Sequence, residues 1–394
     1  MSVANGRQFL SIPGPTNVPD VVLQAMMRPA VDIYTGPLVA MTDALLADLK
    51  KIFRTQGNTY IYAANGHGGW EAALSNVLSR GDHVLALESG RFALGWAEMA
   101  KVMGAEIEVL PGEWHRAVAP AAVEARLAAD KSHRIKAIMV VQVDTASGVV
   151  NDIAAIRRAI DAAKHPALLM VDCVASLGCM PFEMDAWGVD VAMAGSQKGL
   201  MTPPGLAFVA SGPRAEAVHK TANMKTHYWD WTFRQGPEHY QKYCGTPPEH
   251  LLFAQRAALD MLLAEGLEAA WHRHALLARA THAAVTAWSE GQVLAFNVRD
   301  PRERAMSITN VRVNGINSAL LTDYTREKCG VTVGLGIGGY EGKAFRIAHM
   351  GHTNAPMVLG TLGAIEMGLK ALKIPHGSGG VNAAIDSLAA AVPA

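Results

Sequence analysis

The stretch AGSQKGLMTPPG, residues 194–205, places Lys198 directly after an apolar run, among small residues and two prolines. No acidic residue in this stretch can pair with the lysine. Burial of an unpaired ammonium lowers its pKa, and a lysine of this kind can act as a Schiff-base nucleophile or a proton carrier. The alternative is a lysine whose stem packs while its charged head reaches water.

Around this stretch, short apolar runs alternate with helical patterns through the first two-thirds of the chain. The expected strands are 58–64, 83–89, 106–111, 136–143, 167–174 and 189–195. The expected helices are 69–79, 91–104, 119–130 and 152–164. Strands that are apolar throughout, rather than alternating, are buried on both faces. The pattern predicts an α/β fold with a mostly parallel sheet flanked by helices.

The last third of the chain has a different pattern. An irregular segment over 212–248 precedes a helical stretch over 251–288, with a break expected at Gly266. A compact unit then follows, in which strand and helix patterns alternate again. We therefore expect three parts, which are an N-terminal arm (1–20), a large domain (21–271) and a smaller C-terminal α/β domain (272–394).

The composition restricts the classes of function. Lys and Arg together number 35, as do Asp and Glu, and no segment combines basic with aromatic residues in the way of a nucleic-acid surface. The four cysteines show no C-x-x-C spacing, which argues against a zinc site or a disulfide framework. The first residues lack a signal-peptide pattern, and no apolar run approaches the roughly 20 residues of a membrane span. We expect a cytoplasmic protein that binds a small molecule and no metal.

Three further places follow predicted strands, where ligands of parallel sheets bind. Gly66, His67 and Gly68 precede a helix, so their backbone could hold an anion such as phosphate, or could simply form a tight turn. Asp172 ends an apolar strand, where a carboxylate needs a positive partner or caps a nearby turn. Arg346 interrupts an apolar strand of the C-terminal unit, and its guanidinium could bind a carboxylate or pair within its own domain.

One motif suggests a different class of protein. GLGIGG at 334–339 matches the dinucleotide fingerprint G-x-G-x-x-G, which would indicate an NAD-dependent oxidoreductase. The fingerprint requires a helix after the glycines, because the helix N-terminus binds the pyrophosphate. The following residues instead predict a strand, so we interpret 334–339 as a loop.

Taken together, the motifs resemble those of fold-type I pyridoxal-phosphate (PLP) enzymes, and more narrowly the class V aminotransferases of the alanine/serine/aspartate–glyoxylate type. The resemblance covers nearly the whole chain. It includes PGPTNVP (13–19), GHGGWEAAL (66–74), DTASGVV (144–150), LMVDCVASLG (169–178), GSQKGLMTPPGL (195–206), YCGTPP (243–248), LAEGLEAAW (263–271) and FRIAHMG (345–351).

The resemblance implies a role for each matching residue. Lys198 would attach PLP covalently and carry a proton, and Asp172 would keep the pyridine nitrogen protonated. Phe92 would stack on the ring, at a position where relatives more often have Trp. The implied cofactor-binding residues are Gly66, His67, Gly68, Phe92, Thr145, Asp172, Gln197, Lys198, Tyr243 and Thr246.

The resemblance also implies an assembly and a substrate site. Tyr243 and Thr246 match positions that reach the cofactor phosphate of a neighbouring subunit, which implies a homodimer with composite sites and leaves a tetramer open. Arg346 would bind the substrate α-carboxylate, with Gly14 closing over it. Tyr34 lies in the entrance segment Ile33-Tyr34-Thr35, where many relatives carry a His-Arg pair.

The implied reaction is transamination by a ping-pong mechanism, from serine, alanine or aspartate to a 2-oxo acid, with glyoxylate as the first candidate acceptor and glycine as its product. An acidic donor would require a second cation, for which Arg91 and His349 are candidates.

Three alternatives stay open beside this reading. One is a lyase of the same fold, and another is a desulfurase, although Cys329 ends a predicted helix rather than lying on a mobile loop. The third is a non-catalytic PLP-fold binding protein, which would have no need of Lys198, Asp172 and Arg346 together.

Overall fold

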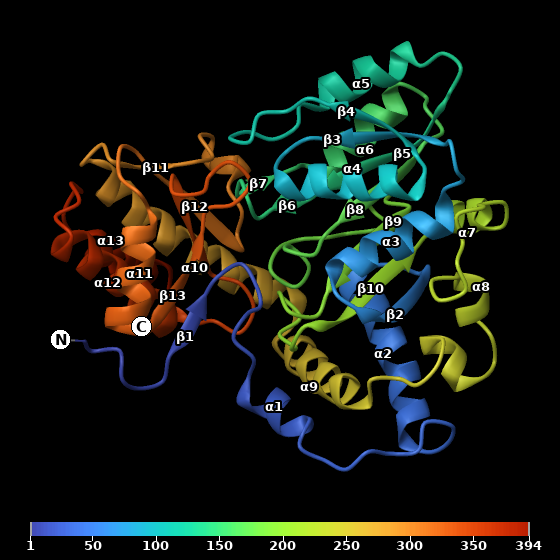
Figure 1. Cartoon of the computed structure of the whole chain (residues 1–394), viewed down its shortest axis with the longest axis horizontal. Coiled ribbons are helices and arrows are strands. Elements are labelled where there is room, and N and C mark those ends of the chain that lie inside the picture. The colour runs from blue at the N-terminus through green and yellow to red at the C-terminus, as the bar shows by residue number, and fades with distance from the viewer. Residues whose placement is uncertain (1, 393–394) are drawn as a thin grey trace.

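Two large β-sheets organise residues 2–392, the part of the chain that the computed structural model describes (Figure 1). The larger sheet has seven strands in the order β2 (Asn58–Ala64), β10 (Gly205–Ser211), β9 (Val191–Gly195), β8 (Leu168–Asp172), β5 (Ile135–Val141), β3 (His83–Leu87) and β4 (Glu106–Leu110). All of its pairings are parallel except those of β10, which is antiparallel to both neighbours. The predicted α/β fold with a mostly parallel sheet is confirmed.

Helices cover both faces of the larger sheet. In β5, Ile138 and Val140 pack into one hydrophobic core while Met139 and Val141 pack into the other, which is why the strand is apolar on both faces from Ala137 to Val141. The first core is covered by α2 (Pro37–Phe53), α5 (Pro120–Ala129), α6 (Ile153–Ala162) and α9 (Glu249–Glu265). The second is covered by α3 (Gly66–Val77), α4 (Arg91–Met103), α7 (Pro213–His219) and α8 (Trp231–Arg234).

The second sheet has the strand order β1 (Phe9–Ser11), β13 (Val331–Leu335), β14 (Ala344–Ala348), β12 (Ile308–Val313) and β11 (Leu294–Phe296). Its core is shared with α10 (Leu267–Ser289), α11 (Ala319–Cys329), α12 (Ala355–Ala371) and α13 (Gly380–Ala391). Strand β1 pairs in parallel with β13, so the start of the chain completes the sheet formed by its end (Figure 1).

Helix α10 connects the two parts of the molecule. Its residues Leu267 and Ala270 pack in a core of the larger sheet, whereas Leu277 and Ala280 pack in the core of the smaller one. We propose that the domain boundary lies between these pairs, inside a continuous helix, close to the expected boundary at residue 272.

Several elements differ from the sequence-based expectations. Strand β10 was not predicted, although the run LAFVA (206–210) that follows Pro203 and Pro204 is apolar throughout. The segment expected to be irregular over 212–248 contains α7, α8 and a short 3₁₀ helix, His239–Tyr243. The loop after β13 leads into strand β14 and not into a helix, as expected for 334–339. Within residues 2–392, no helix combines the length and the apolar character needed to cross a bilayer.

Replacement of the central residue of β10 tests its place in the core. Phe208 is 0% exposed and lies opposite Ile61 on β2 and Ala194 on β9. We expect Phe208→Ala to lower the free energy of unfolding by about 3–5 kcal/mol, because it removes a buried ring and leaves a cavity. Urea denaturation followed by circular dichroism measures this change. Val102→Ala on the exposed side of α4 is the control, with an expected change within about 0.5 kcal/mol.

Candidate active site

A cavity of about 270 Å³ lies at the carboxyl edge of the seven-stranded sheet. Strands β2, β5, β8 and β9 end at Ala64, Val141, Asp172 and Gly195, directly before or at the residues that line it. Those residues are Asn65, Gly66, His67, Trp70, Phe92, Val141, Val143, Thr145, Asp172, Val174, Ala175, Gln197 and Lys198. The structure thus brings together Gly66, His67, Phe92, Thr145, Asp172, Gln197 and Lys198, which the sequence singled out at separate places along the chain.

Asp172 is the last residue of β8 and is 3% exposed. Its Oδ2 accepts a hydrogen bond from the Trp70 indole N–H at 2.6 Å, and its Oδ1 accepts one from the Val174 backbone N–H at 2.7 Å. Burial raises the pKa of Asp172 to about 6, and these two hydrogen bonds oppose the rise. The carboxylate is therefore mostly ionised at neutral pH and can stabilise a positive charge in the cavity.

Lys198 follows β9 and is half-buried at the wall of the same cavity, with its amine directed into the protein. Burial, together with the positive charge of Arg346, lowers the pKa of Lys198 to about 8. Its ammonium donates to the backbone carbonyl of Pro13, and among the described residues it forms no ion pair. A substantial fraction of the amine is thus neutral near physiological pH, which is the form that attacks a carbonyl carbon.

The segment around Gly14 lies directly against this lysine. A Cβ atom at Gly14 would come within 2.5 Å of the Lys198 Nζ, and Gly14 has a φ of +93°, so only glycine suits this position. Thr16 holds the segment in place, because its backbone N–H donates to the Gln197 carbonyl at 3.1 Å and its hydroxyl donates to the Lys198 carbonyl at 3.0 Å.

The predicted anion-binding turn is the start of α3. Asn65 caps this helix, and its side-chain oxygen accepts from the backbone N–H groups of His67 and Gly68 at 3.1 and 3.3 Å. Gly68 does not itself line the cavity. The Gln197 Oε1 atom is buried without a hydrogen-bond partner at the cavity wall, so its amide is available to a polar ligand.

Arg346 lies in the middle of β14 and is 9% exposed. Its Nε donates to the Leu335 carbonyl at 2.6 Å, and one terminal nitrogen donates to the Thr145 carbonyl at 3.1 Å. Burial lowers the pKa of Arg346 to about 10, with the charge of Asp144 acting in the opposite direction. No carboxylate within residues 2–392 forms an ion pair with this guanidinium, so it stays available to an anionic ligand beside the cavity.

Other predicted residues lie away from the cavity. The Tyr243 hydroxyl is buried against the Thr42 hydroxyl at 2.8 Å, while Thr246 and Tyr34 are exposed. His349 is 0% exposed and both ring nitrogens are hydrogen-bonded within the chain. Burial also lowers the pKa of His349 to about 3, so this ring is neutral and cannot serve as the second cation of an acidic donor site.

Sequence reasoning missed two functional neighbours. Asn65 stands directly before a helix and is a residue type that favours the N-cap position, so its role was detectable. Trp70 was not assigned, although a buried indole N–H needs an acceptor, and the acceptor proves to be Asp172. No sequence signal connects Trp70 with Asp172, which are 102 positions apart.

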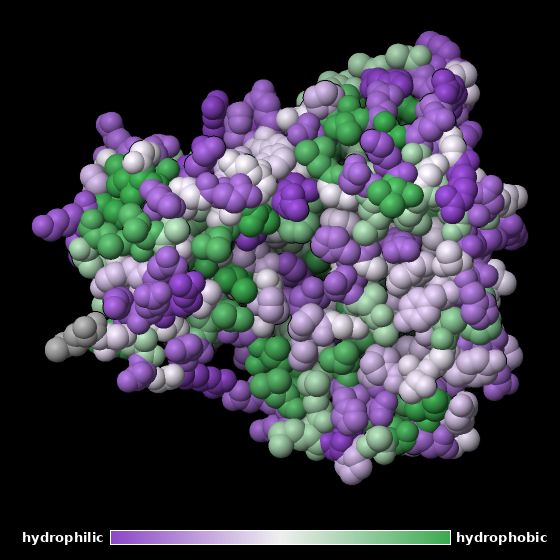
Figure 2. Space-filling model, in the orientation of Figure 1, coloured by the Kyte–Doolittle hydropathy of each residue, from purple (hydrophilic) through white to green (hydrophobic). Residues whose placement is uncertain are grey.

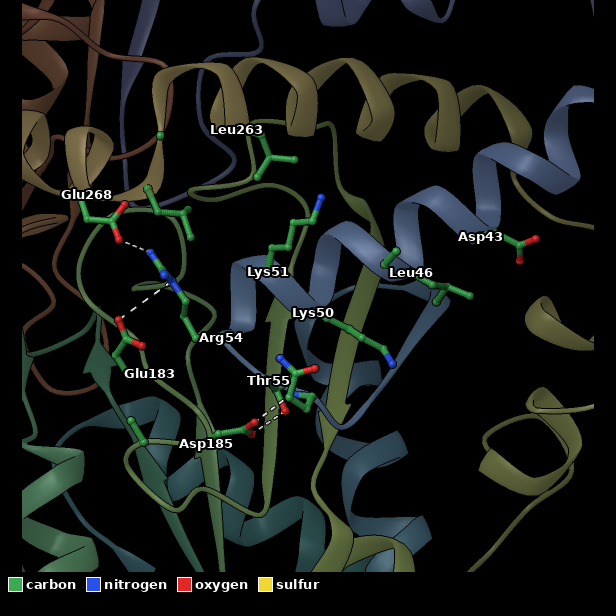
Figure 3. Close-up of a pocket in the computed structure, with 15 residues that line it drawn as sticks. Asp43, Leu46, Lys50, Lys51, Arg54, Thr55, Glu183, Asp185, Leu263 and Glu268 are labelled. Carbon is green, nitrogen blue, oxygen red and sulfur yellow. Dashed lines mark hydrogen bonds and ion pairs between the residues drawn. The ribbon is translucent and has the colours of Figure 1, made fainter.

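A larger groove of about 1000 Å³ lies elsewhere, between the end of α2 and the helices α9 and α10, and it contains none of the predicted site residues. Figure 3 shows that some of its charged side chains are paired: Arg54 lies between Glu268 and Glu183, and the Thr55 hydroxyl donates to Asp185 at 2.6 Å. The smaller cavity, with a buried amine and a buried carboxylate, is therefore the candidate for chemistry.

The site residues can be compared with the needs of PLP. Its aldehyde requires an amine such as Lys198, its ring nitrogen an acid such as Asp172, and its ring face an apolar or aromatic wall such as Phe92. Its phosphate requires hydrogen-bond donors, which the helix start at Gly66 and the side-chain NH2 group of Gln197 can provide. The residues present therefore fit this cofactor.

Comparisons with known proteins agree with the geometry. The family model Aminotransferase class-V matches residues 9–338. The serine–glyoxylate aminotransferase of Methylorubrum extorquens is 41% identical over 95% of this chain and 94% of its own. The L-aspartate–glyoxylate aminotransferase of Paracoccus denitrificans is 39% identical over 92% of this chain and 91% of its own.

A solved structure extends the likeness to the whole fold. The pyridoxamine–pyruvate aminotransferase of Mesorhizobium loti superposes with a TM-score of 0.91 at 27% identity, and the match covers 100% of both chains. The resemblance stated from the motifs is confirmed by these matches. The chain belongs to the class V aminotransferases.

Proposed function

We propose that the protein is a PLP-dependent aminotransferase that transfers the amino group of a small L-amino acid to glyoxylate, giving glycine. The observation that carries the proposal is one cavity that holds a buried amine, a buried carboxylate and, at its side, an arginine without a carboxylate partner. Relatives named for serine–glyoxylate and L-aspartate–glyoxylate transfer support the choice of substrates.

Each residue has a separate task in this reaction. Bound PLP supplies the electron sink that stabilises negative charge at the substrate α-carbon. Lys198 attaches the cofactor and moves the proton at the α-carbon, which its lowered pKa allows near neutral pH. Asp172 stabilises positive charge on the ring nitrogen, and Trp70 holds the carboxylate in place. Arg346 binds and orients the α-carboxylate that donor and acceptor share.

The identity of the amino donor depends on the entrance to the cavity. Serine and alanine require no second cation, whereas aspartate does. Arg91 is the remaining candidate, because it is the first residue of α4 and precedes Phe92 of the cavity wall. Arg91 is exposed, and within the described part of the chain its side chain has no hydrogen bond or ion pair.

The proposal includes a homodimer in the cytoplasm. Val21, Leu23, Met27 and Tyr34 are large apolar side chains left exposed, with Met27 at 83%. They lie in and after α1 (Asp20–Ala25), and Figure 2 shows hydrophobic surface over the region of α1 and α9. An exposed apolar cluster of this kind is typical of a subunit contact. Tyr243 and Thr246 would serve the partner's site, and four free cysteines are compatible with a reducing compartment.

The desulfurase alternative receives less support from the structure. Cys329 ends α11 and packs at the margin of the smaller core, and burial raises the pKa of its thiol. A desulfurase requires a reactive thiolate on a mobile loop at the cofactor. Cys329 does not line the cavity, so it does not provide this group.

Removal of the amine tests the proposal directly. Lys198→Ala is expected to lose covalent PLP and at least about a hundredfold in transamination rate, because both attachment and proton transfer depend on this group. Mass spectrometry after borohydride reduction locates the cofactor, and a donor screen with glyoxylate measures turnover. Lys51→Ala, in the surface groove, is the control and should retain both. A wild-type protein that takes up no PLP would contradict the proposed function.

The pH dependence of cofactor uptake tests the burial of Lys198. Only the neutral amine attacks the aldehyde, and burial lowers the pKa of this amine to about 8. The rate of covalent PLP uptake by cofactor-free protein should therefore rise with pH through 8 and level off above 9. Below pH 7 it should fall roughly tenfold per pH unit. If the pH midpoint of the uptake rate lies near 10.5 instead, the Lys198 ammonium is in contact with water and the lowered pKa is contradicted.

Replacement of the arginine separates substrate binding from cofactor binding. Arg346→Leu should raise KM for both donor and glyoxylate by about tenfold to a hundredfold, since hydrogen bonds to charged groups contribute about 1.5–3 kcal/mol. Covalent PLP should stay at the wild-type level. Arg302→Leu is the control, because the Arg302 side chain is 89% exposed and pairs only with Asp300. An unchanged KM in Arg346→Leu would assign the carboxylate site elsewhere.

A further inference from the structure

A second buried carboxylate, Asp144, lies next to the cavity and has no role in the reaction as proposed. It is 0% exposed and forms the end of β6 (Val143–Asp144), directly before Thr145 of the cavity wall. Its Oδ2 accepts from the backbone N–H groups of Phe92 at 2.9 Å and Ala93 at 3.0 Å. Its Oδ1 accepts from the Ala146 N–H at 3.0 Å. One carboxylate thus accepts from three backbone donors, two in the first turn of α4 and one in the turn after β6.

Helix α4 depends on this carboxylate for its cap. The residue that precedes the helix is Gly90, which has no side chain to accept from the first turn. A Cβ atom at Gly90 would collide with the Asp144 carboxylate. The unpaired N–H groups and the dipole of a helix start favour a negative charge there. Asp144 therefore fixes the first turn of α4, and with it the position of Phe92.

The turn after Asp144 is bonded to the five-stranded sheet, through side chains of β14, of β12 and of the residue that follows β11. Three consecutive carbonyls of this turn accept side-chain hydrogen bonds. The pairs are Thr145 with Arg346 at 3.1 Å, Ala146 with Asn310 at 2.5 Å, and Ser147 with Asn297 at 2.8 Å. Two hydrogen bonds, joined through the Asp144–Thr145 backbone, therefore connect Phe92 with Arg346.

We propose that Asp144 is a positioning residue of the active site, which holds Phe92 against the cofactor and, through the following turn, orients Arg346 toward the substrate carboxylate. The inference rests on the proposed function, because that function defines the tasks of Phe92 and Arg346. Asp144 does not itself line the cavity. It acts by fixing the position of Phe92, which would contact the cofactor, relative to that of Arg346, which would contact the substrate.

Asp144→Asn is the sharpest test, because it keeps the size of the side chain and removes one acceptor. The amide nitrogen cannot accept, so at least one of the three N–H groups loses its partner and its element shifts. We expect the Kd of PLP, measured by equilibrium dialysis of the loaded full-length protein, to rise at least fivefold. The KM of the amino donor should rise by a similar factor.

A double variant shows whether the effect passes through Phe92. Phe92→Ala alone should weaken PLP binding, and Asp144→Asn added to it should weaken binding by less than a further twofold. Independent, multiplying effects of the two substitutions on the Kd would contradict the proposed coupling. If Asp144→Asn does not fold, Gly90→Ala provides the same test, because the new Cβ displaces the carboxylate while the acid remains.

Asp152→Ala is the matched control for a lost helix cap. Asp152 caps α6, where its Oδ1 accepts from the Ala155 N–H at 2.8 Å, and its exposed side chain lies outside the cavity wall. Its loss should lower Tm and leave the Kd of PLP and the KM within twofold. If Asp144→Asn behaves in the same way, the residue is only a cap and the inference is overturned. Wild-type PLP binding and turnover, measured in parallel, report separately on the proposed function.

Discussion

Burial of two ionisable groups at one sheet edge governs the arrangement of the residues around them. Lys198 and Asp172 are both shielded from water, which moves the pKa of the amine down and that of the carboxyl up. Isolated buried charges are strongly unfavourable, so each group needs partners that suit it in the protein interior. The Pro13 carbonyl faces the amine, and the Trp70 indole faces the carboxylate. The need for a glycine at residue 14 and a long aromatic donor at residue 70 follows from this burial.

Much of the larger sheet was predictable, and the reasons are local. A strand such as β5 is apolar on both faces because it separates two cores, and this leaves a signal within seven residues. The positions of Asp172 and Lys198 followed from one rule, that side chains after parallel strands meet at one edge. Strand β10 was not predicted, although its run LAFVA (206–210) is apolar throughout and gives the same local signal as β5. Its antiparallel place between β2 and β9 has no such signal, because it depends on a pairing between residues far apart in the chain.

The details of the site depended on contacts that sequence patterns do not encode. The glycine turn was expected to offer its N–H groups to a ligand, yet Asn65 accepts from two of them. The alternative considered for Arg346 was a carboxylate of its own domain, and its partners within the described residues are instead the carbonyls of Leu335 and Thr145. Every residue has a backbone carbonyl, so the sequence does not indicate which carbonyl accepts a hydrogen bond from an arginine. The roles of Tyr243 and Thr246 stay predictions, since they concern a second subunit.

Strand β1 gives the molecule an interlocked topology. Its residues Phe9–Ser11 form one edge of the sheet made by the last third of the chain, and two residues later the Pro13 carbonyl reaches Lys198. Any cut that separates the first 270 residues from the rest would therefore divide a sheet as well as a helix, and would expose the edge of β13. The amino-terminal strand β1 is structurally part of the sheet that the carboxyl-terminal third of the chain forms. Fragments, fusions and truncations of this protein should be designed with residues 9–16 kept intact.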